Sequence, residues 1–193
     1  MQGIVSGEAD VIFSVDQDGH TVDCLVIGYS EPEFARAAVA ALKRSQFGPI
    51  RINGHPASIR PKLHFNFQAT GVILSLTAMD NIVLRMDRLA GGHRTNKVGT
   101  IRDLDESPRV VHAVSPRYPA SLAAEKIAGR VTLDFFIDEQ GKVRMPALEQ
   151  TDHEAFVDAA AAALMEWQFA PPTRNGKPVV VQARQVFVFS PEG

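Results

Sequence analysis

The residues of this sequence that could carry out catalysis are few, and their spacing matches no known type of active site. Cys24 is the only cysteine, and it lies in an alternating strand pattern that favours a buried thiol over a nucleophile. No phosphate-binding loop, nucleophile elbow or dinucleotide fingerprint is found. The six histidines lack the spacing of metal ligands, both among themselves and with Cys24: His20, His55, His64, His93, His112 and His153. We therefore predict no enzymatic activity, no cofactor and no metal site.

Asp16 and Asp138 invite a catalytic interpretation, because two carboxylates can act as a general acid and a general base. Each aspartate, however, stands three residues before a glycine, Gly19 or Gly141. Aspartate side chains in such positions accept hydrogen bonds from the backbone of a tight turn. We interpret both residues as turn formers.

The two aspartates belong to an internal duplication with an offset of 122 residues. At this offset Phe34 falls on Phe156, and residues 5–67 align with residues 127–189 without a gap. The pairs Gln46-Phe47 and Asn53-Gly54 recur as Gln168-Phe169 and Asn175-Gly176. Self-similarity at a fixed offset is typical of duplicated structural units. The sequence therefore predicts two copies of a small module.

Hydrophobic periodicity predicts the order strand, strand, helix, strand in each copy. Period-2 alternation marks the strands, and apolar residues at helical spacing mark one helix in each copy. Ser30 with Glu33, and Thr151 with Glu154, have the spacing of a capping box at the helix starts. The predicted elements are 7–19, 20–27, 34–44 and 58–67 in the first copy and 131–137, 142–148, 156–167 and 179–189 in the second.

Three segments outside the repeat were considered. Residues 71–79 are rich in β-forming residues; a turn could lead from them into a strand at 82–89, and a helix at 82–90 fits nearly as well. Residues 90–107 have no periodicity and read as a linker. The second copy is preceded by a segment that the first copy lacks, Ser-Pro-Arg-Tyr-Pro at 115–119, followed by a predicted short helix at 120–126. Its prolines favour an extended backbone.

The composition is that of a folded protein, with 45% apolar and 22% charged residues and a net charge of −2. This balance gives no reason to expect binding to nucleic acid. No apolar run of the length of a membrane span and no signal peptide were read in this sequence.

The order of motifs in the second copy resembles the C-terminal domain of TonB-family proteins. The ordered set is Pro-x-Tyr-Pro, Gly-x-Val-x-Leu-x-Phe, an Asp-x-x-Gly turn, an alanine-rich helix and Trp-x-Phe-x-Pro before a last strand. The first copy has Ser45 in place of the tryptophan and resembles a degenerate example. The residues that match are Pro116, Tyr118, Pro119, Gly129, Val131, Phe135, Asp138, Gly141, Trp167, Phe169, Pro171 and Phe189.

The resemblance implies an α+β fold of two TonB C-terminal-like modules, each a small antiparallel three-stranded sheet with helix packed on one face. We expect a degenerate module with an extension at 1–89, the linker at 90–107 and a complete module at 108–193. The resemblance also implies a periplasmic, non-catalytic role in transport and energy transduction, with a peptide of an outer-membrane TonB-dependent transporter or another envelope protein as partner. The anchor helix and Pro-rich spacer of typical members are not visible in this sequence.

A small sheet covered on one face leaves an exposed edge, to which an extended peptide can add as a further strand. Pro61 interrupts the last predicted strand of the first copy and should blunt its edge, whereas 180–188 contains no proline. We therefore predict peptide binding in the second copy, at two groups of residues: Ser115, Pro116, Arg117, Tyr118 and Pro119, and Val180, Gln182, Arg184, Val186 and Val188.

A structural alternative remains open for the same residues. The strand at 180–188 could pair with the other copy or with a second molecule in a homodimer, as terminal strands often do. The protein would then be a scaffold of the cell envelope. Tyr118 could pack on its own module, and Arg117 and Arg184 could be solvated surface residues.

Overall fold

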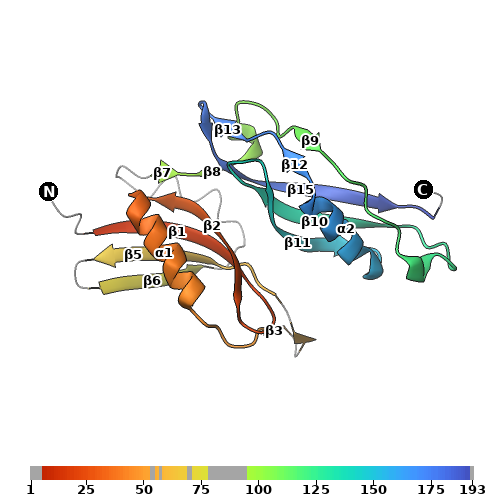
Figure 1. The fold of residues 1–193 in the computed structure, drawn as a ribbon, viewed down its shortest axis with the longest axis horizontal. Coiled ribbons are helices and arrows are strands. Elements are labelled where there is room, and N and C mark those ends of the chain that lie inside the picture. The colour runs from red at the N-terminus through yellow and green to blue at the C-terminus, as the bar shows by residue number, and fades with distance from the viewer. Residues whose placement is uncertain (1–5, 53–54, 57, 69–70, 78–94, 192–193) are drawn as a thin grey trace. The chain divides into compact units, whose positions relative to one another are not determined.

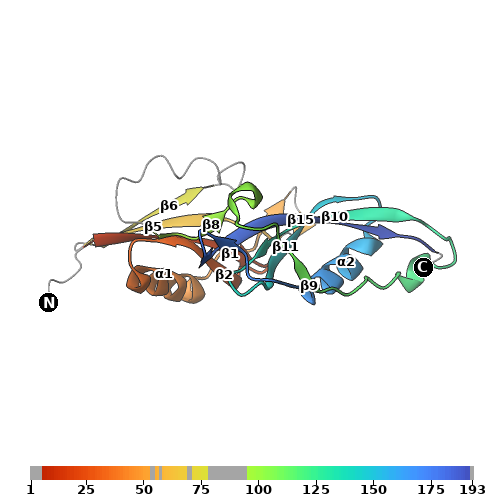
Figure 2. The same cartoon turned by 90° about the horizontal axis from the view of Figure 1, so that it is seen from above.

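The chain divides into two units, Met1–Val98 and Gly99–Gly193. The computed structural model describes residues 6–52, 55–56, 58–68, 71–77 and 95–191. Each unit is an antiparallel sheet with one α-helix on one face, as Figures 1 and 2 show. The predicted α+β class is therefore confirmed, but the three-stranded sheets expected for the two units are not: the sheets have five and four strands, because β6 and β7 add to the first and β8 adds to the second.

The first unit has a five-stranded sheet in the order β6-β5-β1-β2-β7. Its three longest strand pairings, β1 with β2, β1 with β5 and β5 with β6, are all antiparallel. The elements are β1 (Ser6–Val15), β2 (Thr21–Tyr29), α1 (Pro32–Arg44), β3 (Arg51–Ile52), β4 (His55–Pro56), β5 (Lys62–Gln68), β6 (Gly71–Thr77) and β7 (Thr95–Asn96).

Alternation along β1 builds the core of the first unit. Ala9, Val11, Phe13 and Val15 are all buried and face one side of the sheet. There they join the α1 cluster that includes Leu42. The apolar stripe of α1 and the alternating face of β1 bury each other, which is why α1 lies on this face.

The second unit has a four-stranded sheet in the order β11-β10-β15-β8. In this unit β10 pairs antiparallel with both β11 and β15. Its elements are β8 (Val98–Gly99), β9 (Val110–His112), β10 (Gly129–Ile137), β11 (Val143–Thr151), α2 (Ala155–Met165), β12 (Gln168–Phe169), β13 (Thr173–Arg174), β14 (Lys177–Pro178) and β15 (Val180–Phe189).

The core of the second unit repeats the same principle. Val131, Leu133, Phe135 and Ile137 of β10 are at most 2% exposed. They pack with Phe156 and other residues of α2 in one cluster. None of the helices in the described part of the chain has the length and apolar content to cross a membrane.

The helix starts differ from the predicted capping boxes. Helix α1 begins at Pro32 with Glu31 at its N-cap, and α2 begins after Glu154; neither has a side-chain capping bond. The Ser30 hydroxyl instead accepts the N–H of Glu8 at 2.9 Å. Thr151 likewise bonds to the backbone of His153. Both capping predictions are wrong, because each hydroxyl bonds to a backbone group outside the helix.

The predicted helix at 120–126 is also wrong. Only a 3-10 turn forms at Ala120–Leu122, followed by turns. Lys126 has a φ of 51°, in the left-handed region, which a right-handed helix does not allow. A segment this short cannot offset the cost of helix nucleation.

The expectation that Pro61 blunts the edge of the first copy is wrong. Strand β5 begins at Lys62, so Pro61 precedes it, and the Pro61 C=O accepts the N–H of Phe13 at 3.1 Å. Strand β5 is not an edge strand, because β6 pairs along it. The segment at 71–79, noted only for its β-forming residues, supplies this strand; residues 82–89 lie outside the described residues.

Residues 95–107, within the expected linker, bond to both sheets. β7 pairs with β2, and β8 joins the sheet of β15. Asp105 holds the Asn175-Gly176 turn through the two backbone N–H groups, at 2.7 and 2.9 Å. The N–H of Gly176 is the main cause that lowers the pKa of Asp105, with bonds from Thr173 and Asn175 adding to it.

Gly141 should tolerate alanine poorly. Its φ is +79°, and an added Cβ would lie 2.0 Å from the Phe169 carbonyl oxygen. Gly176 is the matched control, with a φ of +71° but no atom within 4 Å of an added Cβ. Gly176→Ala should cost about 1 kcal/mol for the left-handed backbone alone, and Gly141→Ala at least about twice that. Urea unfolding measures both; equal losses would contradict the close approach at Gly141.

Asp105 should contribute stability that depends on pH. Because its pKa is lower in the folded protein, the contribution is complete above the ordinary value of 3.8 and is lost as the pH falls through the folded value. Asp105→Asn should therefore lower stability at neutral pH, and the loss should shrink at acid pH. Unfolding measured from pH 2 to pH 7 tests this; a difference independent of pH would argue against the carboxylate.

Candidate functional site

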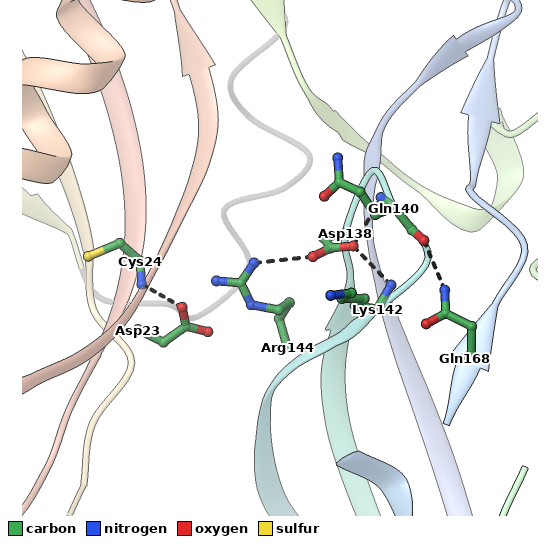
Figure 3. Close-up of polar contacts among 7 residues, drawn as sticks. All are labelled: Asp23, Cys24, Asp138, Gln140, Lys142, Arg144 and Gln168. Atoms are coloured by element: carbon green, nitrogen blue, oxygen red, sulfur yellow. Dashed lines mark hydrogen bonds and ion pairs between the residues drawn. The ribbon is translucent and has the colours of Figure 1, made fainter. Parts of the chain in front are cut away.

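The Asp138 carboxylate serves a turn rather than a reaction (Figure 3). One oxygen accepts the N–H groups of Gln140 and Lys142 at 3.0 and 2.9 Å, and the other accepts Arg144 Nη1 at 3.2 Å. Asp16 repeats the arrangement, accepting the N–H groups of Asp18 and His20. The interpretation of both aspartates as turn formers is confirmed.

The other candidates for chemistry occupy structural positions. Cys24 is half-buried against the core of the first unit, and its N–H donates to the Asp23 carboxylate at 2.8 Å (Figure 3). Among the described residues, no three side chains of His, Cys, Asp or Glu are grouped to hold a metal ion.

Strand β15 has very different neighbours on its two sides. On one side it pairs with β10 over nine residues, from Val181 opposite Ile137 to Phe189 opposite Gly129. On the other side, within the described part of the chain, its only partner is the two-residue strand β8. An added Cβ on Gly99 of β8 would contact Val179, so β8 lies at the start of β15. Most of this edge therefore lacks a partner strand among the described residues.

Backbone hydrogen bonds show which residues of β15 present their polar groups at this edge. The N–H and the C=O of Arg130 both bond to Asp152, at 2.9 and 3.0 Å, and so face β11. In an antiparallel ladder these directions alternate from residue to residue. Arg130 is opposite Val188, so the N–H and C=O of Val188, and of every second residue before it, point away from β10.

A side-chain contact agrees with this direction. The Val186 C=O accepts the Gln185 side-chain amide at 2.7 Å, as expected for a carbonyl directed to the edge. The outward backbone groups thus belong to the predicted set on this strand: Val180, Gln182, Arg184, Val186 and Val188. The sequence indicated these residues because no proline interrupts the strand, and the structure adds the direction of their backbone groups.

The side chains of these residues lie on the helix-free face of the sheet. Their neighbours Val181, Phe187 and Phe189 belong to the core cluster with α2, so the alternate residues point to the other face. Val186 is 46% and Val188 is 71% exposed. Val180, in contrast, is fully buried.

The guanidinium of Arg184 forms ion pairs with two carboxylates on this face. Its guanidinium bonds to Asp134 of β10 at 2.6 and 3.0 Å, and to Glu149 of β11 at 3.0 Å. The hydrogen bonds that Arg184 donates to Asp134, together with the negative charge of Asp134, raise the pKa of Arg184 above the ordinary value. The side chain of Arg184 is therefore engaged within the sheet, while its backbone remains directed to the edge.

The second predicted group, residues 115–119, lies against the helix side of the unit. The Trp167 indole N–H donates to the Val114 carbonyl at 2.8 Å. Tyr118 packs its ring edge on Phe156 of α2, and its hydroxyl donates to the Ile127 carbonyl at 2.6 Å. Ser115 and Arg117 are exposed, while Pro116 and Pro119 are half-buried. The structure thus does not bring the two groups onto one face of the sheet.

Comparison with known proteins identifies the family. The model of the Gram-negative bacterial TonB protein C-terminal matches two segments, residues 2–69 and 114–191, which together exceed half of the chain. The chain belongs to the TonB C-terminal family.

Two relatives and one solved structure were compared. The chain is 32% identical to TonB of Vibrio cholerae over 92 residues, 47% of this chain and 38% of that protein. It is 32% identical to TonB of Pseudomonas aeruginosa over 95 residues, 49% of this chain and 27% of that protein. The solution structure of the Pseudomonas aeruginosa TonB C-terminal domain matches at 27% identity with a TM-score of 0.40, covering 48% of this chain and 92% of that one. The chain thus spans well under half the length of both relatives.

The second TonB segment contains both predicted groups, because it runs from residue 114 to residue 191. Sequence reasoning missed the partners of Arg184 and the pairing of β8 with β15. Asp134 alternates outward along its strand and was a signal by which a partner of Arg184 could have been found. The pairing of β8 with β15 had no such signal, because Val98 and Gly99 show no strand periodicity.

Replacing Tyr118 by Phe tests the structural role of this residue. The change removes the hydroxyl that donates to Ile127 and keeps the ring on Phe156. Stability should fall by about 1 kcal/mol, the net value of one hydrogen bond. Ser115→Ala, at an exposed position, should have no effect on urea unfolding. An unchanged stability of Tyr118→Phe would indicate that the hydroxyl serves another purpose.

Proposed function

We propose that this chain is a non-enzymatic protein-interaction protein of the periplasm, built from two TonB C-terminal modules. Its second module binds an extended peptide of an outer-membrane transporter, or of another envelope partner, by β-strand addition. The observation that carries this proposal is the edge of β15, where outward backbone groups face no strand beyond β8 in the described part.

The proposal of two modules is supported by features that recur at the offset of 122 residues. Gly7 pairs with Phe67 in the first unit as Gly129 pairs with Phe189 in the second. A Cβ on either glycine would collide with the first aromatic residue of the helix, Phe34 or Phe156. Both units therefore need a glycine at the same position, because the helix packs closely on the strand there. Duplication of one module explains this shared requirement.

Strand addition is supported by the chemistry of the β15 edge. The outward N–H and C=O groups of Arg184, Val186 and Val188 can form a ladder with any extended chain. The valine side chains, exposed on the helix-free face, supply apolar contacts to alternate residues of that chain. Residues 115–119 are proposed as a secondary contact on the helix side, through exposed Ser115 and Arg117.

A scaffold is the alternative use of the same edge. An open antiparallel edge can pair with a second copy of itself, and exposed Val186 and Val188 would be covered in such a homodimer. The two functions differ in the partner that pairs with the edge, and Val186→Pro with two control variants separates them.

Proline at Val186 tests strand addition. The N–H of Val186 points away from β10, so Val186→Pro removes an edge donor without breaking the ladder. The ligands to be tested are transporter-box peptides, the short segments of outer-membrane transporters that TonB-family domains bind. The variant should stay folded and lose about tenfold or more in affinity for them, since one bond is lost and the ring obstructs the approaching strand.

Two further variants serve as controls. Val186→Thr keeps the N–H and should bind normally. Gln185→Pro removes a donor directed at β10 and should destabilise the module instead. Affinity is measured by NMR titration and association by light scattering. Full binding by a folded Val186→Pro protein would refute strand addition at β15, and a dimer lost in Val186→Pro without any peptide binding would favour the scaffold.

A further inference from the structure

The first unit has a strand at the position where the second unit has, among the described residues, no strand beyond β8. Strand β6 pairs antiparallel with β5 over seven residues, from Thr77 opposite Lys62 to Gly71 opposite Gln68 (Figure 1). On its other side β5 pairs with β1. Both edges of β5 are therefore occupied along its whole length.

Strand β5 is the counterpart of β15. His64 is opposite Asp10 in the first unit, as Val186 is opposite Thr132 in the second, and both pairs match at the offset of 122 residues. The directions of the backbone groups match as well. The N–H and C=O of Glu8 both bond to Ser30, at 2.9 and 3.0 Å, as those of Arg130 bond to Asp152. The residues of β5 that face β6 are thus Lys62, His64 and Asn66, the equivalents of Arg184, Val186 and Val188.

Strand β6 is not part of the TonB module itself. The first matched segment ends at residue 69 and the second begins at residue 114, so β6 lies outside both. The module therefore ends with β5 in the first unit and with β15 in the second. In the first unit the next segment of the chain adds to the edge of the module.

We propose that β6 is a built-in occupant of the peptide-binding edge of the first unit, and that its pairing is the template for the ligand of the second. This inference rests on the proposed function of the β15 edge. The ligand would run antiparallel to β15, with its N-terminal end near Phe189 and its C-terminal end near Arg184. It would be an uncharged, mostly apolar segment, because β6 reads Gly-Val-Ile-Leu-Ser-Leu-Thr.

The covalent link explains why an external peptide does not compete for β5. Only residues 69 and 70 separate β5 from β6, so pairing is intramolecular and its effective concentration is far above that of a free ligand. The first unit is then closed to peptides, and one binding site per chain is expected.

The test uses the full chain labelled with nitrogen-15. The probe is a synthetic peptide with the sequence of residues 71–77, flanked by lysines for solubility. Amide shifts should be confined to Arg184–Phe189, with β5 unchanged. A nitroxide on the peptide N-terminus should broaden Val188 and Phe189, and one on its C-terminus should broaden Arg184. The same peptide with proline in place of Ile73 and Ser75 should not bind.

Each other outcome of this titration overturns the inference. A reversed order of broadening would show a parallel ligand, and shifts elsewhere would show a different site. Absence of binding would show that β6 is no guide to the ligand of β15. The titration of the unchanged protein tests the inference by itself, even if a proline variant of β6 does not fold.

A matched pair of variants opens the first unit. Ser75 is opposite His64, whose backbone faces β6, so Ser75→Pro removes a bond of that ladder. Leu74→Pro removes an N–H that points away from β5. The number of peptides bound per chain should rise from one to two in Ser75→Pro and stay at one in Leu74→Pro. A single site in a folded Ser75→Pro protein would contradict the role of β6 as occupant.

The inference and the proposed function can fail separately. A transporter-box peptide that binds β15 in the parallel direction would support the function and refute the template. If a β6-derived peptide binds antiparallel but no transporter-box peptide binds, the pairing of β6 still describes the ligand of β15. The outer-membrane transporter is then refuted as the partner.

Discussion

The ladder that joins β1 to β5 in the first unit and β10 to β15 in the second is the interaction on which the remaining structure depends. In the second unit it joins β10 to β15 without a register shift. This register decides two things at once: which side chains of β15 enter the core with α2, and which backbone groups reach the outer edge. A shift of one residue would bury Arg184 and Val188 and expose Phe187 and Phe189.

The helix can lie on this ladder only because one position is free of a side chain. Phe156 stacks on Phe189 with the ring centroids 4.3 Å apart, and any Cβ on Gly129 would enter the space of its ring. Tyr118 then packs on Phe156, so the segment before the sheet is fixed by the same contact. Stability of the core and the position of residues 115–119 therefore have a common origin.

The sequence was sufficient for features that are local or periodic. Alternation along β1 and β10, the apolar stripes of the helices and the Asp-Gly turns depend on neighbours within a few residues, and each was predicted correctly. The capping hydroxyls of Ser30 and Thr151 were not, because several backbone groups compete for one short side chain. The helix predicted at 120–126 does not form, because the segment is too short to offset the cost of helix nucleation.

The site was less predictable because it depends on pairing between distant segments. The sequence indicated β15 and its residues, but the partners of Arg184 depend on the registers of two strand pairs. The pairing of β8 with β15 and that of β6 with β5 were not predictable, because nothing in the sequence of one strand indicates the other as its partner. Hydrophobic pattern shows that a segment is a strand, and it does not show the neighbour of that strand.

An exposed edge is a hazard for any sheet protein, and the two units deal with it by different means. The first covers its edge with β6 over seven residues. In the part of the chain that the structure describes, the second covers only the beginning of β15, with β8, and has the ion-paired Arg184 on the face beside the uncovered part. Charged side chains discourage indiscriminate pairing of edges. Because the guanidinium of Arg184 is tied to Asp134 and Glu149, it lies over the sheet and not at the edge, while the N–H of Arg184 points to the edge. The uncovered stretch that results is short, and a short edge limits aggregation and extended self-pairing.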